Sequence, residues 1–76
     1  MKTYKNTDGN SGVSTYEYGK DWIRIRFKNG TTYEYRSAKI GVHHLDQMKQ
    51  LADLGNGLNA YINNHPRIEK GYSARV

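Results

Sequence analysis

The residues best suited to metal binding or acid–base chemistry are His43, His44 and Asp46. Imidazole and carboxylate groups are common ligands of zinc and common proton carriers in active sites. Adjacent residues on a helix, however, point about 100° apart, so His43 and His44 do not converge readily on one ion. We therefore expect a structural or surface role for this cluster, and no metal site. A small enzyme or ligand carrier is a third hypothesis, and it requires a cleft beside these residues.

The serines and carboxylates do not form the groupings that catalysis needs. No serine lies in a nucleophile motif, and the sequence contains no cysteine. The seven acidic residues are scattered along the chain rather than paired. Gly55-Asn56-Gly57 lacks the lysine and the preceding strand of a phosphate-binding loop, so we expect it to join two helices. The sequence thus predicts a protein that is not an enzyme and holds no cofactor.

Basic and aromatic side chains gather on one expected face of a β-sheet. In a strand, alternate residues share a face, so the residues from 22 to 28 place one tryptophan and three cations together. Arginines pair with phosphate and stack on bases, and an exposed ring offers a stacking platform. The net charge of +5 also favours a polyanion as partner. We therefore predict an RNA or single-stranded nucleic-acid site made of Trp22, Arg24, Arg26, Lys28 and Arg36.

Two other interpretations of this face are open. An antiparallel sheet often leaves one face in water, where Glu17 and Glu34 pair with the arginines and the N-terminal segment covers Trp22. Alternatively, the protein is an interaction module, such as an accessory factor of a phage or mobile element, that docks a protein partner through this face or at a sheet edge. Charge alone does not separate these partners, and the sequence does not reveal the oligomeric state.

Three strands are expected to position these residues. β-Branched and aromatic residues alternate with polar ones over residues 13–18, 22–28 and 31–36. Gly19-Lys20 is expected as the first turn, with Tyr18 opposite Asp21 and Tyr16 opposite Ile23. The pattern predicts a three-stranded antiparallel meander.

The register of the second hairpin decides which face is buried. A two-residue Asn29-Gly30 turn pairs Lys28 with Thr31 and places Glu34 and Arg36 on the core face. A type I turn over Lys28-Asn29, with Gly30 left-handed in a bulge, pairs Phe27 with Thr31, Ile25 with Tyr33 and Ile23 with Tyr35. Apolar residues then meet apolar residues, so we predict the bulged turn.

After Ser37 the apolar period changes to that of a helix. The helical positions are Ala38, Leu45, Met48, Leu51, Ala52 and Leu54, ending at Gly55, with Gly41 loosening the start. Asn56 is expected to cap a shorter helix carrying Leu58, Tyr61 and Ile62, which ends at His65-Pro66. The predicted fold is α+β, a three-stranded antiparallel meander followed by two helices packed on one face of the sheet.

The 76 residues are enough for one domain. We expect a flexible arm over residues 1–12, a domain over 13–66, and a polar tail over 67–76 that docks through Ile68 and Tyr72. With no cysteine, the core must be stabilised by packing alone. The absence of an apolar leader or membrane span makes the cytoplasm the default expectation.

Residues 11–62 resemble the KTSC family, named for the C-terminal domain of some lysyl-tRNA synthetases. The resemblance lies in Ser11-Gly12-Val13 with Tyr18, in Trp22-Ile23-Arg24-Ile25-Arg26-Phe27-Lys28-Asn29-Gly30, in Tyr33-Glu34-Tyr35, and in Gly55, Leu58-Asn59 and Ile62. The chain differs from the family at Ala38-Lys39, where valine-proline is usual, at Gly57 and Asn63, and in a longer first helix. The resemblance implies a domain of short bacterial and phage proteins that has been proposed to bind RNA and has no assigned catalytic residues.

Overall fold

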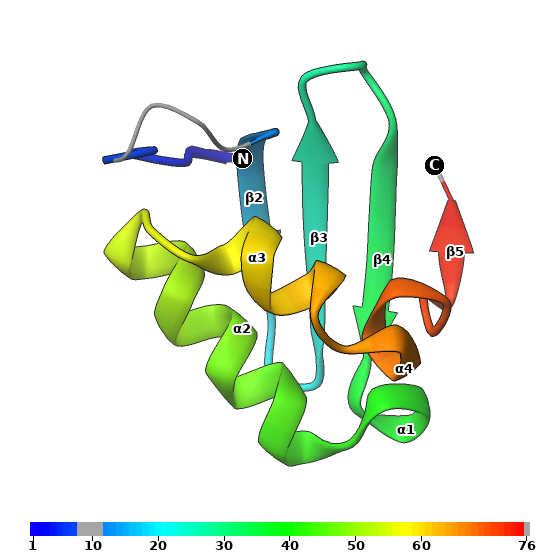
Figure 1. Ribbon diagram of the computed structural model, residues 1–76. Coiled ribbons are helices and arrows are strands. Elements are labelled where there is room, and N and C mark those ends of the chain that lie inside the picture. Colours follow the sequence, from blue (N-terminus) through cyan, green and yellow to red (C-terminus); the bar gives the residue numbers. More distant parts are fainter. Residues whose placement is uncertain (8–11, 76) are drawn as a thin grey trace.

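The computed structural model describes residues 1–7 and 12–75 and shows an antiparallel sheet with helices packed against it (Figure 1). Within these two ranges the chain forms five strands and four helices. The α+β class and the antiparallel sheet predicted from the sequence are therefore confirmed. No helix in these ranges has both the length and the apolar character needed to cross a bilayer.

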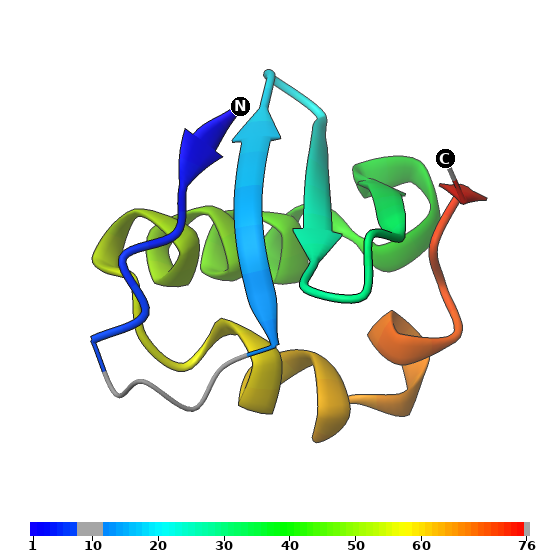
Figure 2. The same ribbon diagram turned by 90° about the horizontal axis from the view of Figure 1, so that it is seen from above.

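The sheet extends the predicted meander at both edges. Its strand order is β1-β2-β3-β4-β5, in which β2 (Val13–Tyr18), β3 (Trp22–Phe27) and β4 (Thr32–Arg36) are the three strands expected from alternation. Two-residue strands, β1 (Lys2–Thr3) and β5 (Ala74–Arg75), pair with β2 and β4. Figure 2 shows β1 beside β2. Both edge strands are too short to carry an alternating pattern, so the sequence did not reveal them.

The β3–β4 hairpin has the predicted bulged turn. Phe27 N–H donates to the Thr31 carbonyl at 2.9 Å, and Gly30 N–H donates to the Phe27 carbonyl at the same distance. Gly30 has a φ of +89°, the left-handed conformation that a glycine adopts without steric cost. Ile25 consequently pairs with Tyr33 and Ile23 with Tyr35, as predicted.

In the β2–β3 hairpin the register differs by two residues from the predicted one, which was wrong. Tyr18 pairs with Ile23 and Tyr16 with Ile25, because the two-residue turn is Lys20-Asp21 and not Gly19-Lys20. Gly19 N–H closes this turn by donating to the Trp22 carbonyl at 3.1 Å. The Trp22 indole lies against Gly19, where no side chain competes with it. A shift of two residues preserves side-chain parity, so the buried face is the one expected.

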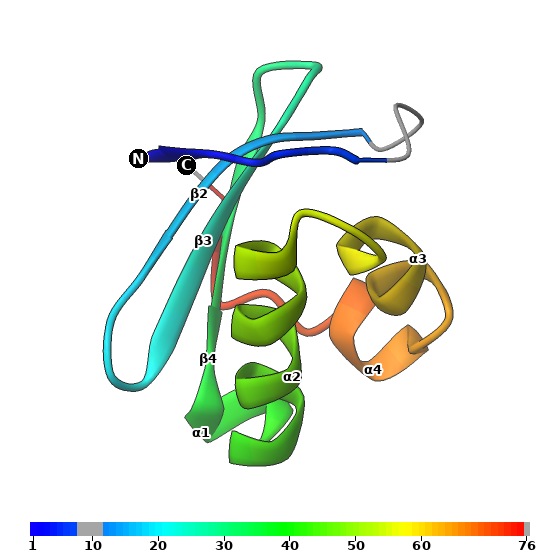
Figure 3. The same cartoon turned by 90° about the vertical axis from the view of Figure 1, so that its left-hand side faces the viewer.

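The helices all lie on one side of the sheet (Figure 3). The predicted long helix is divided at Gly41, whose φ is +92°, into α1 (Ser37–Ile40) and α2 (Val42–Leu54). α3 (Leu58–Asn63) begins after Gly57, so the expected cap at Asn56 is wrong. α3 ends before His65-Pro66 as predicted, and Pro66 then begins α4 (Pro66–Glu69).

The hydrophobic core fills the space between sheet and helices. The predicted inward residues of the sheet are Tyr16, Ile23, Ile25 and Tyr35, fully buried, with Phe27 and Tyr33 partly buried against them. The helices contribute Ile40, Leu45, Met48, Ala52, Leu58, Ile62 and Ile68. Ala38 and Leu54 were expected among the apolar helical positions but are exposed. Leu54 is the last residue of α2 and is not among its buried residues, which are Leu45, Met48 and Ala52.

Both terminal segments contribute to this core. Tyr4 is only 3% exposed, and its hydroxyl accepts a hydrogen bond from Leu58 N–H at 3.3 Å. This burial corrects the expectation of a flexible arm for the described residues 1–7 and 12; residues 8–11 lie outside the described ranges. In the tail, Ile68 is buried and Tyr72 packs on the core, as expected.

Candidate nucleic-acid interface

The face of the sheet opposite the helices carries the predicted arginines. Cross-strand pairing places Arg24 opposite Glu34, Trp22 opposite Arg36 and Arg26 opposite Thr32. The structure thus brings Trp22, Arg24, Arg26 and Arg36 together as the sequence predicted, on a face that no helix covers (Figure 3). We call these four residues the outer-face cluster.

Glu34 organises two of these arginines. Its side chain is 7% exposed, and its two carboxylate oxygens accept hydrogen bonds from Nε of Arg24 and Nε of Arg36, each at 2.8 Å. The hydrogen bond from Arg24 is the main cause that lowers the pKa of Glu34, while desolvation opposes it and Arg36 reinforces it. Glu34 is therefore ionised at neutral pH and fixes both guanidinium groups.

Trp22 is partly covered by its own neighbours. The guanidinium carbon of Arg24 lies 5.4 Å from the centre of the Trp22 ring, a cation–π contact, and the indole also rests against Gly19. Arg24 and Gly19 are thus contacts of Trp22 among the described residues. The ring is half-buried and retains some exposed surface.

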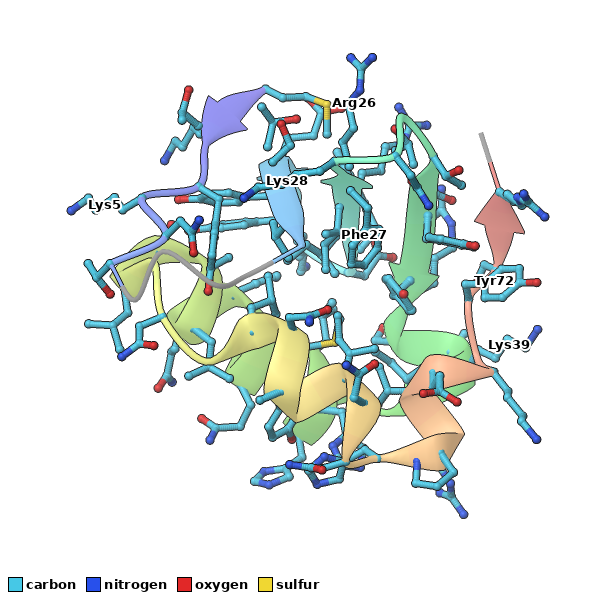
Figure 4. All side chains as sticks on the ribbon, turned by 45° about the horizontal axis from the view of Figure 1, so that its top comes forward. Lys5, Arg26, Phe27, Lys28, Lys39 and Tyr72 are labelled. Atoms are coloured by element: carbon cyan, nitrogen blue, oxygen red, sulfur yellow. The ribbon has the colours of Figure 1, made fainter. Side chains whose placement is uncertain are left out.

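Arg26 is the free cation of the face. It is exposed and points away from the helices, whereas its neighbour Phe27 points toward them (Figure 4). Within the described ranges its guanidinium forms no ion pair or hydrogen bond. Because three arginines share the face with Glu34 and Glu17, which lies 3.7 Å from Arg24, the face carries one excess positive charge.

Lys28 does not lie with the outer-face cluster. β3 ends at Phe27, so the alternation that would carry Lys28 to the outer face stops before it. Its N–H donates to the Gly12 carbonyl at 2.7 Å, and Lys28 is among the residues that line a pocket on the helical side of the sheet. The structure therefore places Lys28 after the end of β3, beside this pocket, and its predicted part at the rim of the nucleic-acid site stays a prediction.

The histidines belong to an aromatic cluster with Tyr61. His44 Nδ1 lies 2.7 Å from the Tyr61 hydroxyl, and His65 Nδ1 lies 2.7 Å from the Tyr61 carbonyl. Burial is the main cause that lowers the pKa of His44, with His65 the next contributor. In the described ranges no three histidine, aspartate or glutamate side chains are grouped so as to hold a metal ion. The neutral imidazole of His44 thus serves the packing between α2 and α3.

Comparison with protein-family models, curated proteins and solved structures finds no match. The resemblance to the KTSC family therefore rests on the sequence motifs alone. In the structure, Tyr35 of the Tyr-x-Tyr motif is buried in the core and Tyr33 is partly buried against it, while the intervening Glu34 organises the opposite face. The motif thus supplies both the core and the anchor of the arginines.

Proposed function

We propose that this protein is a non-enzymatic module that binds single-stranded nucleic acid, RNA above all, through the outer-face cluster. The observation that carries the proposal is the fixed pair of guanidinium groups on Glu34, next to the unpaired Arg26. Glu34 bonds Nε of Arg24 and of Arg36, which leaves the terminal nitrogens of Arg36 available to phosphate oxygens. One terminal nitrogen of Arg24 faces Glu17 at 3.7 Å, and its other terminal nitrogen can contact phosphate. Guanidinium groups that are already oriented lose less conformational entropy when they bind.

Electrostatics supports a sequence-independent interaction with phosphate. The chain carries a net charge of +5, and the face keeps an excess cation after its internal ion pairs are counted. Such binding releases counterions and weakens as salt rises. Trp22 adds a partly exposed ring beside Arg24 on which a base can stack.

The direct test measures fluorescence anisotropy of labelled single-stranded RNA, duplex RNA and duplex DNA at two salt concentrations, with Trp22 emission followed in parallel. We expect salt-sensitive binding that favours the single strand and changes Trp22 emission. Arg26→Ala should weaken binding and reduce the slope of log K against log salt by roughly 0.7, the value for one phosphate contact on a single strand. The Arg24→Ala/Arg26→Ala double variant should abolish binding.

Arg67→Ala is the matched control, since it removes the same charge from α4, on the side of the helices. Equal loss of binding in Arg67→Ala and Arg26→Ala would mean that overall charge, and not this face, drives binding. Absence of binding at low salt, together with recovery of a stoichiometric protein partner that survives nuclease treatment, would replace the proposal with the protein-interaction alternative.

A further inference from the structure

A pocket of about 390 Å³ opens on the helical side of the sheet, beside the β3–β4 turn. Aromatic rings from three segments line it: Phe27 from β3, Tyr33 and Tyr35 from β4, and Tyr72 from the tail. Its volume lies within the range of small-molecule sites. Figure 4 shows Phe27 directed toward the helices and Tyr72 beside β4.

Three of these rings present surface to a planar ligand. Phe27 and Tyr33 meet edge to face at 73° with centroids 5.7 Å apart, and Tyr33 and Tyr72 are tilted by 57° at 4.7 Å. All three side chains are only partly buried. Steeply inclined rings of this kind form walls rather than a closed stack, and a flat aromatic ligand stacks on such walls.

Tyr35 provides an unused hydrogen-bonding group in this pocket. Tyr35 is 2% exposed, and its hydroxyl makes no hydrogen bond with any described residue. Within the described ranges no buried side-chain nitrogen or oxygen lacks a hydrogen-bond partner, so the small exposed part of Tyr35 includes this hydroxyl, at the surface of the pocket. Burial is the main cause that raises the pKa of Tyr35, and the nearby Tyr33, Tyr72 and Glu69 add to the effect. The Tyr35 hydroxyl is therefore a neutral hydrogen-bond donor that an acceptor atom of a ligand can contact.

The helical wall adds further unpaired polar groups. Asn59 and Asn63 stand one turn apart on α3, both line the pocket, and neither carboxamide is hydrogen-bonded within the described ranges. Each carboxamide offers donors and an acceptor, which match the mixed donor and acceptor edge of a nucleobase. Glu69 of α4 adds a carboxylate to the same lining.

The surrounding charges favour an anionic ligand over a cationic one. An aromatic pocket with a carboxylate is also the arrangement that binds organic ammonium ions. Here, however, Lys28 lines the pocket, and the guanidinium of Arg75 lies 5.9 Å from the Tyr33 ring centre. Two cations beside the aromatic walls repel an ammonium ion and attract a phosphate.

We propose that this pocket binds one guanine base of a guanine nucleotide, stacked on the aromatic wall of the pocket. The guanine N1–H and 2-amino group lie side by side and can both donate to the Glu69 carboxylate. Guanine O6 and N7 accept hydrogen bonds from Tyr35 or the two asparagines. Lys28 contacts the phosphate. The site is separate from the outer-face cluster. It stands whether or not that face binds RNA.

The test is a titration of the full chain with GMP, AMP, CMP and UMP, followed by amide chemical shifts in NMR spectra. We expect GMP to bind most tightly and to shift residues around Phe27, Asn59 and Tyr72. Tyr35→Phe removes only the unpartnered hydroxyl. It should therefore leave the free energy of unfolding unchanged and lower the affinity for GMP by roughly five- to tenfold. Glu69→Gln should reduce the preference for GMP over UMP by about tenfold.

Asn64→Ala is the matched control for Asn59→Ala and Asn63→Ala, because Asn64 is exposed and does not line the pocket. A guanine-containing oligonucleotide that competes with GMP would identify the base within a strand as the source of the ligand, and failure to compete would identify the free nucleotide. Absence of GMP binding at millimolar concentration, equal affinity in Tyr35→Phe, or displacement of GMP by tetramethylammonium would overturn the proposal.

These experiments test the outer-face proposal and the pocket proposal independently of each other. Arg26→Ala should leave GMP binding unchanged, whereas Tyr35→Phe should leave the salt dependence of RNA binding unchanged. Loss of RNA binding with intact GMP binding would contradict the outer-face proposal alone. Intact RNA binding without any GMP binding would contradict the pocket proposal alone.

Discussion

Nε of Arg24 donates a hydrogen bond to Oε1 of Glu34 at 2.8 Å, across the pair of strands at the centre of the open face. Glu34 binds Arg36 through its other oxygen, so one buried carboxylate fixes two guanidinium groups. This arrangement makes Glu34 the residue on which both the stability and the charge of the outer face depend.

Glu34→Gln should destabilise the protein and strengthen nucleic-acid binding. A neutral amide cannot accept two charged hydrogen bonds equally, so we expect the free energy of unfolding in urea to fall by about 1–2 kcal/mol. The face meanwhile gains one positive charge, which should tighten RNA binding by roughly fivefold at low salt. Glu17→Gln, which removes an exposed carboxylate, is the control and should change stability by less than about 0.5 kcal/mol.

The ionised Glu34 carboxylate should make part of the stability sensitive to acid. Arg24 and Arg36 hold the folded pKa of Glu34 below its ordinary 4.5, so the folded state binds fewer protons than the unfolded state. This contribution is fully present above pH 4.5 and is lost as the pH falls through the lower folded pKa. In urea denaturation from pH 7 to pH 3, the free energy of unfolding should fall less in Glu34→Gln than in the parent chain. An equal fall in both proteins would contradict this assignment.

Tyr16→Phe should loosen the junction between β2 and α2. The Tyr16 hydroxyl donates to Oδ1 of Asp53 at 2.8 Å, and the Tyr18 hydroxyl donates to Oδ2 at 2.6 Å. We expect Tyr16→Phe to lower the free energy of unfolding by about 1 kcal/mol, and the exposed Tyr18→Phe to cost less. Burial, followed by the bond to Asp53, raises the pKa of Tyr16 to about 12, so stability should also fall between pH 10 and 12 in the parent but less in Tyr16→Phe.

Gly30→Ala tests the bulged turn. Apart from Gly30 and its two chain neighbours, no residue has an atom within 4 Å of the position that a Cβ would take, so the expected cost comes from the φ of +89°. We expect a loss of about 1–2 kcal/mol in thermal or urea unfolding. Gly30→Asn should cost less, because asparagine tolerates left-handed backbone better than alanine does. Equal stability of all three proteins would mean that the turn is not left-handed in solution.

His44 should make the protein less stable in mild acid. Its folded pKa is lowered from 6.5, chiefly by burial, and His65, His43 and Arg67 place further positive charge around it. The unfolded state therefore binds the proton more readily, and stability is lost as the pH falls from about 6.5 through the folded pKa. Denaturation at pH 7.5 and 5 should show this loss in the parent and in His43→Gln, whose ring is exposed, but to a smaller extent in His44→Gln.

Much of the central sheet was predictable because its signals are local. Alternation over a few residues defines each strand, and the choice between two registers at Asn29-Gly30 depends only on which side chains face each other. The same parity argument placed Arg24, Arg26 and Arg36 on one face. The parity argument does not extend to Lys28, because β3 ends at Phe27 and side chains alternate between faces only within a strand.

Long-range packing decided the features that the sequence left open. The first turn lies at Lys20-Asp21, where the Trp22 indole covers Gly19, and β1 and β5 exist only because neighbouring strands offer free backbone groups. The aromatic pocket joins Phe27, Asn59 and Tyr72, which no local pattern relates. The sequence alone therefore determined the strands and their faces, because hydrophobic alternation acts over neighbouring residues, whereas the tertiary structure decided the pocket and the pairing of the arginines, because both depend on contacts between distant segments.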